Sequence, residues 1–315
     1  LLAVGTLGMA FSTHIAALVF TLYLLRLFGQ GMMTQNALTA TARWFAASRG
    51  RAISLVTLGH NMGEALFPFI FVAVAAMIGW RSTWIASSIV LIVIALPAIT
   101  LLLSKERQQK ASEIAQNAQP GKHWTRSEVI RDPWFWILLS GVLAPPIIGT
   151  TIFFHQIYLV ELRSWSLTIF ASAFPVMAIS TIVFALITGY LVDRFGAVKL
   201  LPTFLIPLAL SCFALATLDT QWAPFIFMSL MGVSYGFSST LVGAIWPEIY
   251  GTQHLGAIRA LVVSMMVFGT AAGPGISGWL IDNDVDYLKQ ILAMGIYCLI
   301  ACGGLYLASR HLLNR

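Results

Sequence analysis

The stretch TWIASSIVLIVIALPAITLLL (83–103) contains no charged side chain. It is as long as the ~20 apolar residues that cross a bilayer as a helix. Similar apolar blocks fill most of the chain, which is 58% hydrophobic and only 10% charged, whereas a soluble protein carries about 25% charged residues. A transmembrane β-barrel would show alternating segments of about ten residues instead, and this sequence has none. The sequence therefore predicts an all-α polytopic membrane protein.

The apolar blocks divide into nine predicted spans after a first short run at 1–11. As a helix this run would reach only ~17 Å, too little for a bilayer core of ~30 Å. It also lacks the basic start and cleavage site of a signal peptide. We therefore expect it to be the end of a longer span, and the chain to be N-terminally truncated. The nine spans are expected at 15–43, 52–78, 83–103, 133–160, 167–192, 198–218, 222–247, 257–281 and 288–309.

Lysine and arginine residues predict the orientation of the spans. Fourteen of the 18 lie in one set of connections or at the C-terminus, and the alternate connections hold only Arg81, Arg163 and Lys289. Because basic loops stay in the cytoplasm, we expect the first set and the C-terminus to be cytoplasmic. The expected location is a bacterial inner (plasma) membrane. The basic residues are scattered singly between apolar blocks, so the net charge of +6 does not indicate nucleic-acid binding.

The longest polar segment, 104–132, predicts a division of the chain into two units. A linker of this length inside a bundle usually separates structural units. We expect 1–103 to be the remainder of an N-terminal helical bundle, 104–132 to be a cytoplasmic linker and 133–315 to be a C-terminal six-helix bundle. Thr125, followed three residues later by Glu128, has the pattern of a capping box and predicts a short surface helix.

Two parts of the chain repeat each other at a distance of 210 residues. Gly59 and Gly63 in one span correspond to Gly269 and Gly273 in another, and the basic stretches RGRA (49–52) and GAIRA (256–260) precede these spans. A repeat in the same orientation is typical of secondary transporters. If the halves match, the first lacks about two and a half of twelve transmembrane helices.

Four motifs resemble one known family, the major facilitator superfamily. GYLVDRFGAVK (189–199) is similar to its G-x-L-x-D-R-x-G loop, and RLFGQG (26–31) resembles the R-x-x-G-x-G motif of its fourth helix. RWFAASRGRA (43–52) is similar to the monocarboxylate-porter and oxalate/formate-antiporter branches. GHNMGEALFP (59–68) lies where the family has a helix rich in glycine and proline, although Glu64 often corresponds to a small residue there. The resemblance implies two helical bundles that alternate the access to a central site.

Asp193 and Arg194 stand at the expected cytoplasmic end of the predicted span 167–192. A carboxylate at this place gains from the dipole of a neighbouring helix N-terminus. The resemblance implies that this loop holds the cytoplasmic side closed and thus has a gating role, and we expect Arg259 to be its partner.

Arg26 lies inside an apolar span, where a charge costs ~3 kcal/mol unless it meets a cavity or a partner. Tyr23, Arg26, Gln30 and Thr34 follow each other in steps of three or four residues and form one polar stripe. The stripe predicts that Arg26 and Gln30 face the bundle interior. Arg26 is either an anion-binding or coupling residue of the translocation path, or a structural residue in an ion pair or a helix-cap contact.

Glu64 is an acidic residue deep within a span, with His60 one turn earlier and Asn61 beside it. Partial desolvation would suit a glutamate for carrying protons, but a static ion pair with Arg26 and a position facing lipid are alternatives. A metal at His60 and Glu64 is disfavoured, because two ligands at i and i+4 rarely make a site.

Polar residues of the C-terminal unit form the second candidate region. His155 and Gln156 are expected at the polar centre of the span after the linker, where Pro145 and Pro146 would break the helix. They either line a cavity or bond between helices. Tyr235 either contacts the solute or belongs to a close helix packing of small residues.

These features predict a secondary active transporter, a symporter or antiporter that moves a small solute by alternating access. Arg26 favours an organic anion such as a carboxylate, and Glu64 and His60 favour proton coupling. No cofactor and no metal are expected, and the expected partners are the solute, protons and the lipid bilayer. An integral-membrane enzyme is the alternative, but H-E-x-x-H, G-x-S-x-G and a phosphate loop are missing. A transporter-like sensor without net transport is a further alternative.

Overall fold

The structure is a computed structural model that describes residues 1–45, 48–104 and 124–314. Every regular element in these ranges is a helix, which confirms the predicted all-α fold. The helices are α1 (Leu2–Phe11), α2 (Ile15–Leu25), η1 (Arg26–Met33), α3 (Thr34–Trp44), α4 (Arg49–Ile78), α5 (Trp80–Val90), η2 (Leu91–Ala95), α6 (Leu96–Leu103), α8 (Arg126–Arg131), α9 (Pro133–Phe154), α10 (Gln156–Leu162), α11 (Leu167–Ser172), α12 (Phe174–Phe195), α13 (Ala197–Leu200), α14 (Ile206–Thr217), α15 (Ala223–Tyr250), α16 (Leu255–Asp282) and α17 (Tyr287–Leu313).

Seven helical segments of the described chain are long and apolar enough to cross a membrane. They confirm a multi-pass protein, but some predicted spans are divided. The span expected at 198–218 consists of the short α13 and the twelve-residue α14. Pro175 and Pro207 stand in the first turns of α12 and α14, where a missing backbone N–H does no harm and fixed φ favours a helix start. The seven segments are Ile15–Trp44, Trp80–Leu102, Pro133–Phe154, Thr168–Phe195, Ala223–Tyr250, Leu255–Asp282 and Tyr287–Leu313.

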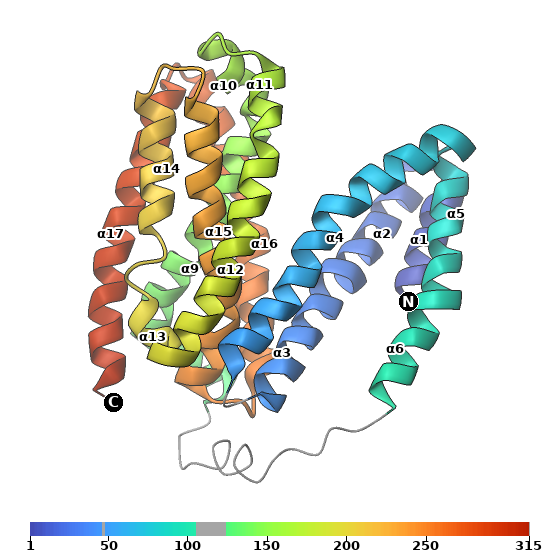
Figure 1. The fold of residues 1–315 in the computed structure, drawn as a ribbon, viewed down its shortest axis with the longest axis horizontal. Coiled ribbons are helices and arrows are strands. Elements are labelled where there is room, and N and C mark those ends of the chain that lie inside the picture. The colour runs from blue at the N-terminus through green and yellow to red at the C-terminus, as the bar shows by residue number, and fades with distance from the viewer. Residues whose placement is uncertain (46–47, 105–123, 315) are drawn as a thin grey trace.

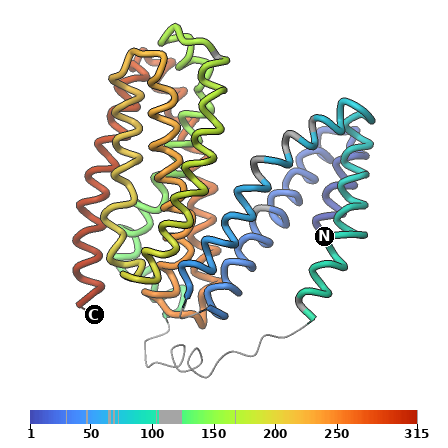
Figure 2. Tube along the Cα trace, viewed as in Figure 1, coloured from blue at the N-terminus to red at the C-terminus, as the bar shows by residue number. Residues whose placement is uncertain are grey.

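The helices form two groups, α1–α6 and α8–α17 (Figure 1). We call the end of the molecule where α6 ends, α9 begins and the C-terminus lies the linker side, and the opposite end, with α10 and α11, the far side. The groups touch where α3 and α4 reach α12, α15 and α16. Figure 2 shows the two traces meeting at this end and separating toward the far side. The largest buried side chains gather in the second group, among them Trp246, Tyr250 and Phe135.

The end of the predicted linker is tied to the second group. Thr125 and Glu128 form the predicted capping box at the start of α8, which confirms the short helix. Asp132 is buried and accepts hydrogen bonds from the Trp134 backbone N–H (3.2 Å) and the Tyr250 hydroxyl (3.2 Å). The start of α9 is therefore anchored to the linker-side end of α15.

Candidate functional site: the contact between the two helix groups

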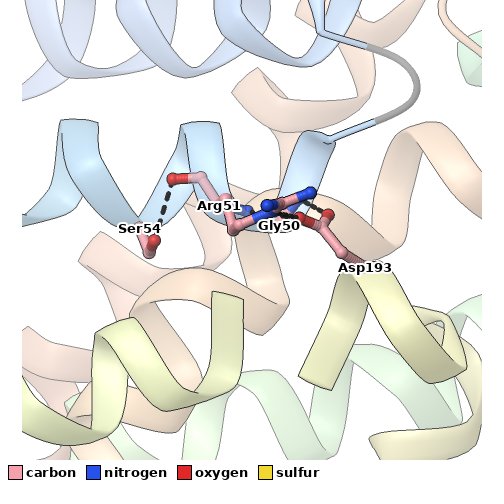
Figure 3. A network of polar contacts seen from close by, with 4 residues as sticks. All are labelled: Gly50, Arg51, Ser54 and Asp193. Atoms are coloured by element: carbon pink, nitrogen blue, oxygen red, sulfur yellow. Dashed lines mark hydrogen bonds and ion pairs between the residues drawn. The ribbon is translucent and has the colours of Figure 1, made fainter. Parts of the chain in front are cut away.

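The first turn of α4 is bound by a carboxylate from the other helix group. Asp193, near the end of α12, accepts hydrogen bonds from the backbone N–H of Gly50 (2.6 Å) and of Arg51 (3.1 Å), and from Nε of Arg51 (2.8 Å), as Figure 3 shows. Ser48, the N-cap residue of α4, makes no side-chain cap. Asp193 therefore satisfies N–H groups that a helix start leaves without partners, and it lies at the positive end of the helix dipole.

Two glycines allow this contact. A Cβ on Gly50 would collide with the backbone oxygen of Gly189 and lie 2.8 Å from Cβ of Val192. A Cβ on Gly189 would lie 2.5 Å from Oγ of Ser54 and 2.9 Å from the oxygen of Gly50. Backbones this close leave no room for a methyl group on either side, so the crossing of α4 and α12 depends on both glycines.

Further bonds and packing join the groups at the same end. Arg43, at the end of α3, donates from Nε to the oxygen of Thr252 (3.2 Å) and from Nη2 to the oxygen of Gln253 (3.3 Å). Ile53 of α4 is fully buried, and its methyl group occupies the space beside Gly243 of α15. We call the whole set, which is centred on Asp193, Gly50 and Gly189, the linker-side contact.

The expected pairing of Asp193 with Arg259 is wrong, because Arg51 takes this place. Arg259 is only 3% exposed and donates from Nη2 to the oxygen of Gly243 (2.5 Å). It begins the second turn of α16 and binds α15, whereas Arg51 lies in the turn of α4 that faces α12. Arg194 also stays within its own helix, with Nη1 3.4 Å from the Tyr190 hydroxyl.

Glu248 of α15 supports the loop that carries Asp193. Its two carboxylate oxygens accept from the backbone N–H of Ala197 (2.8 Å) and Val198 (3.3 Å) at the start of α13. Gly196, before this start, has φ of 84°, a conformation that glycine adopts at no cost. Glu248 also lies within electrostatic range of Arg49. Glu248 therefore fixes the turn that follows α12, next to Asp193 and the linker-side contact.

The motif around Arg26 forms an unexpected local structure. RLFGQGMM is a π-helix, η1, between α2 and α3. π-Helical segments are rare in proteins, and those that occur are often found at functional sites. The side chain of Arg26 is exposed and has an interaction partner. The side chain of Gln30 lies outside the described part of the structure.

The polar residues predicted on the next span lie on α4. His60 is exposed and is also not without a partner. The Nδ2 atom of Asn61 is buried and has no hydrogen-bond partner among the described residues. The side chain of Glu64 lies outside the described part, so its relation to Arg26 stays a prediction.

His155 lies at the end of α9 rather than at the centre of a span. The 22 residues of α9 rise ~33 Å from the linker side, so His155 reaches the far side, where Gln156 begins α10. Pro145 and Pro146 lie inside α9 without breaking it, so the predicted helix break at these prolines is wrong. The Nε2 atom of His155 is 3.0 Å from the oxygen of Pro274 in α16.

Tyr235 contacts α9 nearer to the linker side than His155 does. Its hydroxyl donates to the oxygen of Pro145 (3.4 Å) and occupies the space where a Cβ on Gly149 would be. This contact is a hydrogen bond between α15 and α9. The candidate residues of the second group therefore lie at different depths and do not form one cluster with each other.

The comparison with models of protein families shows to which family the chain belongs. The profile of the Major Facilitator Superfamily matches residues 1–274, and a second match covers residues 149–312. The chain belongs to the major facilitator superfamily.

Relatives within the superfamily are described as transporters, and this membership places the chain in a transporter family rather than an enzyme family. The riboflavin transporter MCH5 of Saccharomyces cerevisiae is 22% identical over 85% of this chain and 55% of its own length. The MFS transporter asaE of Aspergillus flavus is 23% identical over 94% of this chain and 66% of its own length. The MFS-type transporter pynF of Aspergillus niger is 21% identical over 85% and 63%. The chain thus spans less than two thirds of the length of these relatives.

Several residues of this superfamily member were not predicted from the sequence. Arg43 and Arg51 stand in the motif RWFAASRGRA, which predicts no contact between the helix groups, and Glu248 belongs to none of the motifs. The signals were present: Gly50 stands at a helix start beside two arginines, and Glu248 follows Pro247 near the end of a span. Among the described residues there is no group of three or more His, Cys, Asp or Glu side chains that could hold a metal.

Proposed function

We propose that the protein is a secondary active transporter that moves a small solute by alternating access, and that this structure is a state closed on the linker side. The observation that carries the proposal is the Asp193 contact with the start of α4. It joins the two helix groups through three hydrogen bonds to one carboxylate. Such a contact is small enough to break when the groups rock against each other, yet specific enough to stabilise one state.

The position of the contact supports this state. The helix groups meet at their linker-side ends and separate toward the far side (Figure 1). The excess of basic residues on the linker side predicts that this side faces the cytoplasm. In that orientation the protein is closed toward the cytoplasm, and the C-terminus is cytoplasmic. An inner or plasma membrane stays the predicted location, and the relatives named above are fungal.

We propose an organic anion such as a carboxylate as the solute, with Arg26 as its ligand. The support is the position of Arg26 within an apolar segment, the π-helix that begins at this residue and the likeness of RWFAASRGRA to monocarboxylate porters. A π-turn widens the helix and turns side chains out of the regular α-helical register, which suits a binding residue.

Arg26→Gln is expected to abolish the thermal stabilisation that carboxylates give to the purified protein. The neutral amide removes the charge but keeps hydrogen-bonding capacity. The measurement is a thermal-shift screen of carboxylates, amines, sugars, nucleosides and riboflavin with the wild-type protein and this variant. If neutral or cationic compounds stabilise both proteins equally, Arg26 is a structural residue and the anionic substrate class is wrong.

We also propose proton coupling through Glu64 and His60, which lie one turn apart on α4. Glu64→Gln is expected to keep solute binding but to make uptake into proteoliposomes independent of an imposed pH gradient, because glutamine cannot release a proton. The control is His14→Gln, which changes a histidine before α2. Loss of stability in Glu64→Gln, without a change in pH dependence, would instead indicate a static ion pair.

A further inference from the structure

A hollow between α9 and α16 has no role in the proposed gate or at Arg26. It has a volume of about 590 Å³ and is lined by Thr150, Phe154, His155, Thr270, Trp279 and Asp282, together with small residues of α16. The hollow is an open groove along the two helices rather than an enclosed cavity, and a small organic molecule would lie against one wall of it. The residues of α9 that line the hollow stand at its far-side end. The two helix groups separate toward this side (Figure 1).

The packing of the two helices leaves this space open. A Cβ on Gly269 or Gly273 would collide with Ile147 or Thr151, so the helices touch closely there. Beyond this crossing the ring of His155 lies between them. A Cβ on Gly275, which also lines the hollow, would meet nothing within 4 Å. The backbone of α16 at Gly275 is therefore a free wall of the hollow.

The polar groups of the hollow mainly accept hydrogen bonds. The hydroxyl of Thr150 donates to the oxygen of Pro146 (2.5 Å), and that of Thr270 donates to the oxygen of Val267 (3.0 Å). Because a carbonyl can only accept, the bond to Pro274 requires the proton of His155 on Nε2. Beyond these bonds, the oxygens of the two hydroxyls can still accept hydrogen bonds.

Two further acceptors complete the lining. Pro274 has no N–H, so the carbonyl of Thr270, four residues earlier, lacks its helical partner. No hydrogen bond or ion pair engages the Asp282 carboxylate within the described part of the chain. A ligand that satisfies this lining has to bring donors, and a positive charge suits Asp282 best.

Two exposed aromatic side chains are among the residues that line the hollow. Phe154 is 72% exposed and Trp279 is 64% exposed. Aromatic rings stack on such faces, and cations are attracted to them, to indole above all.

We propose that this hollow is a binding site for an aromatic organic cation, such as a protonated amine attached to a planar ring. The ring lies against Trp279 and Phe154, and the ammonium group binds the carboxylate of Asp282. The site belongs to the second helix group alone and is separate from Arg26. It therefore does not depend on the nature of the transported solute or on transport itself.

Three indoles of matched shape test the charge preference. Binding of tryptamine, tryptophol and indole-3-acetate to the protein in lipid nanodiscs is measured by equilibrium dialysis with labelled compounds. We expect tryptamine to bind most tightly and indole-3-acetate least tightly. Asp282→Asn is expected to weaken tryptamine binding about fivefold, as for a partly exposed ion pair, and to leave tryptophol unchanged. Equal binding of the amine and the acid overturns the proposal.

A filled hollow tests the place of binding. Gly275→Leu puts a side chain into the open space and is expected to abolish tryptamine binding. Gly256→Leu is the matched control, since Gly256 is an exposed glycine of the same helix that also has nothing within 4 Å of a Cβ. It should bind tryptamine like the wild type. Both changes favour the helix, so both proteins should fold, which circular dichroism checks. Tryptamine binding that survives Gly275→Leu overturns the proposal, whether or not the protein transports any solute.

Discussion

Asp193→Asn is expected to shift the protein from the linker-side-closed state toward the opposite state. The amide can still accept a hydrogen bond, but the charge that faces Arg51 and the helix dipole of α4 is lost. For a carboxylate that is only 10% exposed, this loss costs about 1.5 kcal/mol, roughly a tenfold change in the ratio of the two states. Arg51 is 65% exposed, so its ion pair contributes little to this figure.

The shift can be measured as a distance on the far side. Spin labels at Met77 and Ile179, both strongly exposed, report the separation of α4 and α12 away from the contact. We expect a shorter distance to become populated in Asp193→Asn, because opening of the linker side brings the far-side ends together. Arg194→Gln is the control, since Arg194 bonds only within α12 in the described structure. An unchanged distance distribution in Asp193→Asn would show that the contact does not stabilise the closed state.

Gly50→Ala is expected to prevent closure of the linker side. Its methyl group would collide with the Gly189 oxygen, and this clash is relieved only when α4 and α12 move apart. The cost of such overpacking is about 1–3 kcal/mol or more, comparable with the whole contribution of Asp193. Transport is then expected to fall with the closed state.

Labelling of a cysteine at Ser54 measures this closure. Ser54 is 2% exposed and packs on Gly189, so a cysteine there should react slowly with a maleimide in the wild-type background and several-fold faster with Gly50→Ala. Gly59→Ala is the matched control in the same helix, because nothing lies within 4 Å of its added methyl group. It should leave the labelling rate unchanged and stabilise α4 by up to ~1 kcal/mol. Slow labelling in Gly50→Ala would mean that the crossing adapts without opening.

The sequence by itself determined the class of the protein, the helical segments and the family. These depend on properties of single segments: an apolar block such as 83–103 has to form a helix in a bilayer, because no water is there to bind its backbone groups. The capping box of Thr125 and Glu128 is equally local. The place of Asp193 beside a helix start was also predictable, because a carboxylate at the end of α12 needs a partner of positive potential.

Only the tertiary structure decided which partner that is. Asp193 and Arg51 are 142 residues apart, and their meeting depends on how closely α4 and α12 cross, which Gly50 and Gly189 set together. The same holds for His155, whose depth follows from where α9 ends and not from its place within an apolar run. Hydropathy and capping act within one helix, whereas the gate and the hollow arise from pairs of helices whose mutual packing no single segment of the sequence contains.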